Sequence, residues 1–313
     1  MKIKSIKIGG VTTKNNVFFA PLAGFSDSAM RKIAVECGAG LTFTEMVSCK
    51  GLKYTPSASS ELLHFYPEET PKAVQIFGSD PEIMGEIAKS EYLAPFDIID
   101  INMGCPVPKI YSNGEGSALL NDIYLAQKII TQVKKAGKPV SVKFRIGLTE
   151  NSLITRDFSL ACQDAGADLI TIHGRTRDKY YSGTPNYFEI ESAKNAVKIP
   201  VIANGGIFTV KDANDMMEKT GADGVMLARG ALENPLLFCD ILGIKHPKTL
   251  KELIVEQANL LKERYGVERS AIMFRKQAAY YLKGVIGGRK LRDEIFSSTN
   301  INEVISMILS ANF

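Results

Sequence analysis

The chain has 313 residues, of which 45% are hydrophobic and 23% charged, and its formal net charge is +4. This composition excludes a disordered or low-complexity protein and is typical of one large globular domain, alone or with a small second one. No apolar run approaches the roughly 18 to 20 residues that span a bilayer, and the opening MKIKSIKIGG lacks the apolar stretch of a secretion signal. We therefore expect a cytoplasmic protein with no membrane partner.

Residues 2–8 alternate polar and apolar side chains before Gly9 and Gly10, which predicts a short hairpin that closes the bottom of the main fold. Eight short β-branched or apolar runs follow, and we predict buried strands at 17–20, 41–44, 73–77, 98–101, 140–144, 169–172, 199–203 and 223–227. Helical stretches lie between them, at 27–37, 81–90, 121–136, 153–165, 187–196 and 210–219.

Eight βα units in about 240 residues, with no GxGxxG after the first strand, favour a (β/α)8 TIM barrel of the α/β class over an open doubly wound sheet. Beyond the barrel, helical spacing covers 249–264, 270–284 and 301–310. Because glycine and proline interrupt the pattern near 243–247, we predict a barrel domain over 1–244 and a small all-helical domain over 245–313. The second segment holds 12 Lys and Arg against 7 Asp and Glu, and 1–244 holds 26 against 27, so the excess positive charge lies in the tail.

Polar residues stand where the predicted strands end, which is the face of a barrel that carries chemistry. Asn204-Gly205-Gly206 and Ala228-Arg229-Gly230 follow strands seven and eight, where small residues and an arginine favour a phosphorylated ligand. Lys143 and Gln75 at two other strand ends fit a flavin better than a sugar phosphate. Spacing alone does not separate FMN from other phosphorylated ligands.

Five cysteines are scattered without CxxC or metal-ligand spacing, so we expect reduced thiols and no metal site. Cys105 differs from the others because it lies in the glycine- and proline-rich loop NMGCPVPK after the fourth strand, outside any apolar run. It is therefore the cysteine we expect to take part in chemistry.

Together these segments resemble the tRNA-dihydrouridine synthase family, in particular its bacterial B-type branch, over nearly the whole chain. The matching motifs are APLAGFSDSAMR at 20–31, TEMVS at 44–48, VQIFGSDP at 74–81, DINMGCPVPK at 100–109, VKFRIG at 142–147, IHGRTR at 172–177, IANGG at 202–206, GVMLARGALENP at 224–235 and the tail segment 274–295.

The resemblance implies an FMN-dependent oxidoreductase in which NADPH reduces the flavin and a uridine in tRNA then receives hydride from flavin N5 at C6 and a proton from Cys105 at C5. It assigns FMN to Pro21, Leu22, Ala23, Gln75, Lys143, His173, Asn204, Gly205, Gly206, Ala228 and Arg229. It makes Asn102, Arg145 and Tyr181 candidates to hold the uracil, and Lys109 a contact to the RNA. In the basic tail, where tRNA phosphates would bind, the favoured residues are Arg275 and Lys276.

Position 206 departs from the family, which usually has Asp where this chain has glycine. Two alternatives stay open at this stage. One is an FMN barrel that acts on a free pyrimidine, as a dihydroorotate dehydrogenase does, and the other is a tRNA-binding factor that keeps flavin as a structural ligand. The uridine position, the preference for NADPH over NADH and the oligomeric state are also open, with a monomer as the default.

Overall fold

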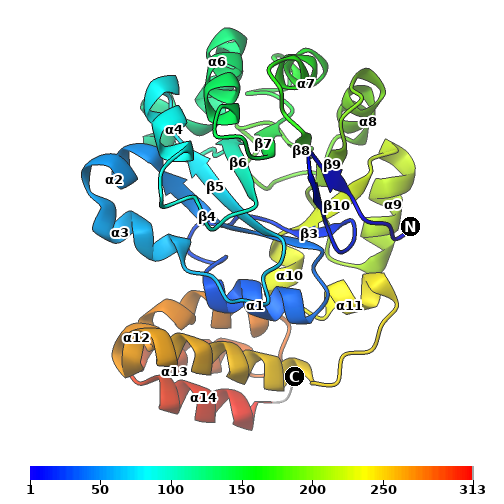
Figure 1. Cartoon of the computed structure of the whole chain (residues 1–313). Helices are drawn as coiled ribbons and strands as arrows, with labels where there is room; N and C mark the ends of the chain where they lie inside the picture. Colours follow the sequence, from blue (N-terminus) through cyan, green and yellow to red (C-terminus); the bar gives the residue numbers. More distant parts are fainter. Residues whose placement is uncertain (312–313) are drawn as a thin grey trace.

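Eight parallel strands close into a barrel in the computed structural model, which describes residues 1–311. The strands follow one another around the barrel in chain order, and the last pairs with the first. They are β3 (Val17–Phe19), β4 (Leu41–Ser48), β5 (Lys72–Phe77), β6 (Ile98–Met103), β7 (Val140–Arg145), β8 (Leu169–His173), β9 (Val201–Asn204) and β10 (Gly224–Leu227). The TIM barrel and all eight predicted strands are confirmed, and Figure 1 shows the helices that surround them.

The N-terminal hairpin consists of β1 (Lys7–Ile8) and β2 (Val11–Thr12), which pair antiparallel as expected. Ile6 and Ile8 are buried in an apolar cluster with Phe18 of β3 and Leu169 of β8. The hairpin thus covers the end of the barrel opposite the functional loops, because it packs on residues at the amino ends of the strands.

The predicted helices of the outer layer are all present. Each connects two strands, and most begin at an Asp, Asn or Thr whose side chain accepts a hydrogen bond from the first turn. They are α1 (Ser28–Glu36), α4 (Pro81–Ala88), α6 (Ile123–Lys134), α7 (Thr155–Asp164), α8 (Tyr187–Ala196) and α9 (Val210–Thr220).

Short helical pieces that the sequence pattern did not predict fill the longer connections. Some lie between β4 and β5, some form the loop after β6, and two follow β10. They are α2 (Cys49–Tyr54), α3 (Pro56–Ser60), the 3-10 turn η1 (Glu61–Leu63), α5 (Pro108–Ser112), the 3-10 turn η2 (Gly116–Asn121), α10 (Arg229–Glu233) and α11 (Leu237–Leu242).

The tail forms a helical region of its own, built from α12 (Leu250–Tyr281), α13 (Gly288–Ser297) and α14 (Ile301–Ser310). The two predicted segments 249–264 and 270–284 are the two parts of α12, which is broken at Gly266 where φ is 76°. Helix α13 was not predicted as a separate element. Figure 1 shows this region beneath the barrel, where α12 packs against α1 and α10. The division into domains at 244/245 stays a prediction, although the chain passes from α11 to α12 across it.

Within residues 1–311, no helix has both the length and the apolar character needed to cross a bilayer. The same part of the chain holds no group of three or more His, Cys, Asp or Glu side chains placed to hold a metal ion.

Candidate active site

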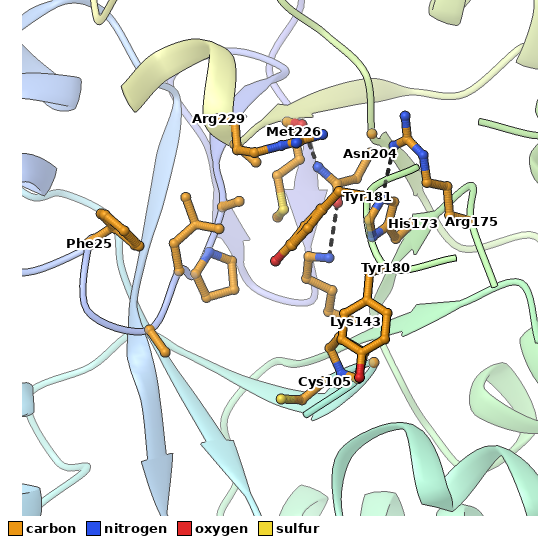
Figure 2. A pocket seen from close by; sticks show the side chains of 18 of the residues that line it. Phe25, Cys105, Lys143, His173, Arg175, Tyr180, Tyr181, Asn204, Met226 and Arg229 are labelled. Carbon is orange, nitrogen blue, oxygen red and sulfur yellow. Dashed lines mark hydrogen bonds between the residues drawn. The ribbon is translucent and has the colours of Figure 1, made fainter. Parts of the chain in front are cut away.

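A cavity of about 400 Å³ opens at the carboxyl ends of the strands. Figure 2 shows the side chains that line it. Most of the predicted site residues do so, from six different strand ends: Pro21, Leu22, Ala23, Asn102, Cys105, Lys143, Arg145, His173, Tyr181, Asn204, Gly205, Gly206, Ala228 and Arg229.

Four predicted residues lie outside the cavity wall. Gln75 is fully buried beneath it, and its amide donates to Asp100 at 2.6 Å and accepts from Asn102 at 2.8 Å. Lys109 and Lys276 are exposed, on α5 and α12 respectively. Arg275 is half-buried and donates to the carbonyl of Ser298 at 2.7 Å, so part of its guanidinium is used inside the helical region. Their predicted contacts with ligands stay predictions.

Lys143 points from β7 into the cavity and is held there by Asn204 (Figure 2). Its Nζ donates to the side-chain oxygen of Asn204 at 3.0 Å, and the Asn204 amide in turn donates to the carbonyl of Met226 at 2.7 Å. Burial, and then the nearby charge of Arg145, lower the pKa of Lys143 to about 8. The amine therefore remains mostly cationic at neutral pH, and the bond to Asn204 fixes its charge in the cavity wall.

His173 stands beside Arg175 at the end of β8. Its Nε2 lies 3.3 Å from a guanidinium nitrogen of Arg175, and since that guanidinium can only donate, Nε2 is the acceptor. Burial and the surrounding cations hold the pKa of His173 well below its usual range. The imidazole is therefore neutral, with its proton on Nδ1.

Glycines form a cradle beside Arg229 at the ends of β9 and β10. Gly205 and Gly206 have φ of 121° and 70°, and a Cβ on Gly205 would lie 2.8 Å from the ring of His173. A Cβ on Gly230 would lie 2.3 Å from the carbonyl oxygen of Ile207. Only glycine allows the backbone to approach this closely, and the cradle with its adjacent guanidinium fits a phosphate group.

Hydrogen bonds hold the backbone of Cys105 at both its N–H and its carbonyl. The Asn102 side-chain oxygen accepts from the backbone N–H groups of Gly104 and Cys105, at 3.1 Å and 2.9 Å. The Cys105 carbonyl accepts from the backbone N–H and the hydroxyl of Ser117, at 3.1 Å and 2.7 Å. Burial raises the pKa of Cys105 above the ordinary thiol value. The loop thus presents a protonated thiol to the cavity.

Arg145 ties the loops after β6 and β8 together. Its guanidinium donates to the carbonyls of Gly104, Thr176 and Tyr180 at 2.9–3.0 Å. Burial lowers its pKa to about 10, so the group keeps its charge. The neighbouring Tyr181 ring lies in the cavity, with the guanidinium carbon of Arg229 4.5 Å from its centroid.

Comparison of the sequence with known proteins identifies a family. The family model described as Dihydrouridine synthase (Dus) matches residues 18–311. The chain belongs to the dihydrouridine synthase family. It is 35% identical over 310 residues to the probable tRNA-dihydrouridine synthase 1 of Synechocystis. That alignment covers 96% of this chain and 87% of the Synechocystis protein. It is 36% identical over 290 residues to the tRNA-dihydrouridine synthase B of Pasteurella multocida. That alignment covers 90% of this chain and 87% of the Pasteurella protein.

Solved structures share the barrel. A 2-naphthoyl-CoA reductase matches with a TM-score of 0.61 at 11% identity, over 77% of this chain and 52% of the other. Morphinone reductase in complex with tetrahydroNAD matches with a TM-score of 0.54 at 14% identity, over 78% and 92%. At these identities the likeness shows the fold of this dihydrouridine synthase family member and nothing more.

Several residues of the site in this family member were missed by the sequence analysis. Phe25, Phe208 and Tyr280 also line the cavity, while Ser117 and Gly116 hold Cys105 from behind, since a Cβ on Gly116 would lie 3.0 Å from the Cβ of Cys105. Ser117 and Gly116 carry no signal in one sequence. Tyr280 had one, because it follows Lys276 by four residues and so shares its helix face.

Proposed function

We propose that this chain is a tRNA-dihydrouridine synthase that uses FMN and NADPH to reduce the C5–C6 double bond of a uridine in tRNA. The observation that carries the proposal is the protonated thiol of Cys105, clamped over the same cavity that holds the partly buried cation Lys143 and the glycine cradle. The two relatives support it, since one is named a probable tRNA-dihydrouridine synthase and the other a tRNA-dihydrouridine synthase.

The donor set fits FMN. Its phosphate would take the backbone of Gly205 and Gly206 and the guanidinium of Arg229, with Ala228 small enough to let it approach. Pro21, Leu22 and Ala23 would pack on the ring system, and His173 and Asn204 would bond polar edges. Gln75, predicted to contact FMN, would support the site from beneath by holding Asn102. Lys143 would stabilise negative charge on the ring through its fixed ammonium. Bound FMN would supply the redox chemistry, by taking hydride from NADPH and delivering hydride to C6 of the uracil.

The protein's own residues would complete the reaction. Cys105 would give its thiol proton to C5, which a thiol can do at neutral pH because its raised pKa keeps it protonated. Arg145 and Tyr181 would orient the uracil from the loops that Arg145 joins. Asn102, a candidate for the uracil, would act mainly by positioning Cys105, since its side-chain oxygen is already bonded to the loop.

The substrate would be a tRNA rather than a free pyrimidine. Lys109 is exposed on α5, three residues after Pro106 of the cavity wall. The tail carries the protein's excess positive charge, with Arg275 and Lys276 on its longest helix. A substrate whose backbone carries phosphates accounts for these cations, whereas orotate or uridine would not reach them. We place the enzyme in the cytoplasm, as a monomer.

The test is spectroscopic. The purified protein should be yellow from FMN, should bleach with NADPH, and should be reoxidised anaerobically by unmodified tRNA but not by uridine or orotate. Cys105→Ala should keep the flavin and its reduction by NADPH and lose reoxidation by tRNA about 100-fold or more, the usual contribution of a general acid. Reoxidation by orotate, or unchanged dihydrouridine formation in Cys105→Ala, would overturn the proposal.

A further inference from the structure

The helical tail supplies one side chain to the cavity within residues 1–311. Tyr280, in the last turn of α12, lines the cavity together with Phe25 from the loop after β3. The two rings meet edge to face, with centroids 5.2 Å apart and planes at 86°. Both rings are half-buried, so they retain surface that a third flat group could cover.

A cation lies one helical turn from this pair. Lys276 is on the same face of α12 as Tyr280, and its ammonium lies 3.8 Å from where a Cβ on Gly24 would be. Lys276 is exposed and forms no ion pair with any residue in 1–311. Burial raises the pKa of the Glu45 carboxyl, and the charge of Lys276 partly offsets that rise without a direct ion pair between the two. The exposed ammonium can therefore still meet a phosphate beside the aromatic pair.

The pair is set apart from the reacting thiol. Figure 2 shows Phe25 and Cys105 on different sides of the cavity. A target base that reacts at Cys105 would therefore not occupy the aromatic pair. The pair would remain open to a neighbouring group of the same RNA strand. Packing between tail and barrel alone does not require the two rings to line the cavity.

We infer that Phe25 and Tyr280 form an aromatic clamp that stacks a nucleobase next to the target uridine, while Lys276 contacts the phosphate that joins the two nucleotides. The inference rests on the proposed function and names the RNA segment that this site holds. Stacked aromatic rings beside a cation are the general means by which proteins bind single-stranded RNA. The clamp would hold the strand beside the flipped base and so direct the uracil to Cys105.

The test uses the full-length, FMN-loaded and NADPH-reduced enzyme, with reoxidation by in vitro transcribed tRNA as the readout. Tyr280→Ala should lower the second-order rate constant with tRNA about tenfold to a hundredfold, which is the usual effect of removing one base–aromatic stack. Tyr280→Phe keeps the ring and should stay close to the wild-type rate. Phe25→Leu keeps an apolar contact for Tyr280 and should behave as Tyr280→Ala does, which covers the case in which alanine folds poorly.

Salt dependence separates the stack from the phosphate contact. Lys276→Gln should reduce the slope of log rate against log salt by about one, whereas Tyr280→Ala should leave the slope unchanged. Lys135→Gln, at the exposed far end of α6, is the matched control and should change neither.

Wild-type rates in both Tyr280→Ala and Phe25→Leu would overturn the clamp and leave the proposed function intact. A fall in the rate constant that is accompanied by loss of thermal stability and of bound flavin would also overturn it, since that result would mean that the two rings serve packing alone. A wild-type enzyme that NADPH reduces and tRNA does not reoxidise would overturn the proposed function, and the clamp with it.

Discussion

The side-chain oxygen of Asn102 accepts a hydrogen bond from the backbone N–H of Cys105 at 2.9 Å, which fixes the thiol to the end of β6. The Asn102 amide donates to Gln75, and Gln75 donates to the buried carboxyl of Asp100. A row of side-chain hydrogen bonds thus runs from the barrel interior to the reactive loop. The position of the thiol therefore depends in part on Gln75 and Asp100, which are buried beneath the cavity.

Asn102→Ala should therefore impair the reaction without removing the cofactor. The change leaves two loop N–H groups without their acceptor, at a cost of about 1–3 kcal/mol for each buried group. Both N–H groups are only partly buried, so we expect reoxidation by tRNA to fall about tenfold to a hundredfold, which corresponds to about 1.4–2.8 kcal/mol. The reduction of flavin by NADPH should stay unchanged. Asn195→Ala, on the exposed end of α8, is the control. Full activity in Asn102→Ala would contradict the positioning role.

The pKa of Lys143 predicts how FMN affinity depends on pH. In the protein without ligand this pKa is lowered to about 8, so the amine is charged below pH 8 and neutral above it. A negatively charged ligand binds the charged form, so affinity should be highest below pH 8 and weaken by up to about tenfold per pH unit above it. Fluorescence titration of FMN from pH 6.5 to pH 9.5 would measure this, in roughly half-unit steps.

Lys143→Met should abolish that slope and weaken binding at all pH values. A slope that persists in Lys143→Met would assign the titration to another group.

Gly205 and Gly137 allow backbone strain to be separated from damage to the cradle. Both have positive φ, 121° and 75°, but a Cβ on Gly205 would collide with His173, whereas a Cβ on Gly137 would meet nothing within 4 Å. Backbone strain should cost Gly137→Ala about 1–2 kcal/mol of folding stability, and Gly205→Ala should cost more because its Cβ also collides with His173. FMN affinity should fall in Gly205→Ala alone. Equal FMN affinity in the two variants, measured by the same titration, would show that the glycine cradle does not contribute to FMN binding.

Arg275 and Lys276 are adjacent in sequence and should behave differently. Arg275 donates to the carbonyl of Ser298, the residue that follows α13, so Arg275→Ala should lower the free energy of unfolding by about 1–3 kcal/mol. Lys276→Gln should change it by no more than about 0.5 kcal/mol, as exposed substitutions do. Urea denaturation of the two variants measures both. Equal stabilities would show that the Ser298 contact contributes nothing.

The barrel could be predicted because its strands are buried on both faces. Such strands are continuous apolar runs, and the helices between them begin at recognisable caps, so both patterns are local in sequence. The pieces α2, α3 and η1 were not predictable in this way. They are too short for a helical period to show, and they form where the connection from β4 to β5 packs on the barrel.

The sequence by itself determined which strand ends carry polar groups, and with them Cys105, Lys143, Arg229 and the glycines of the cavity wall. Local chemistry selects these residues, since each strand ends at a loop whose side chains are visible in the sequence. Only the tertiary structure decided that Gln75 lies beneath the wall and that Tyr280 reaches it from α12. The depth of Gln75 follows from the register between β5 and β6. The position of Tyr280 follows from how α12 packs on α1 and α10. Neither arrangement depends on residues that are near in sequence.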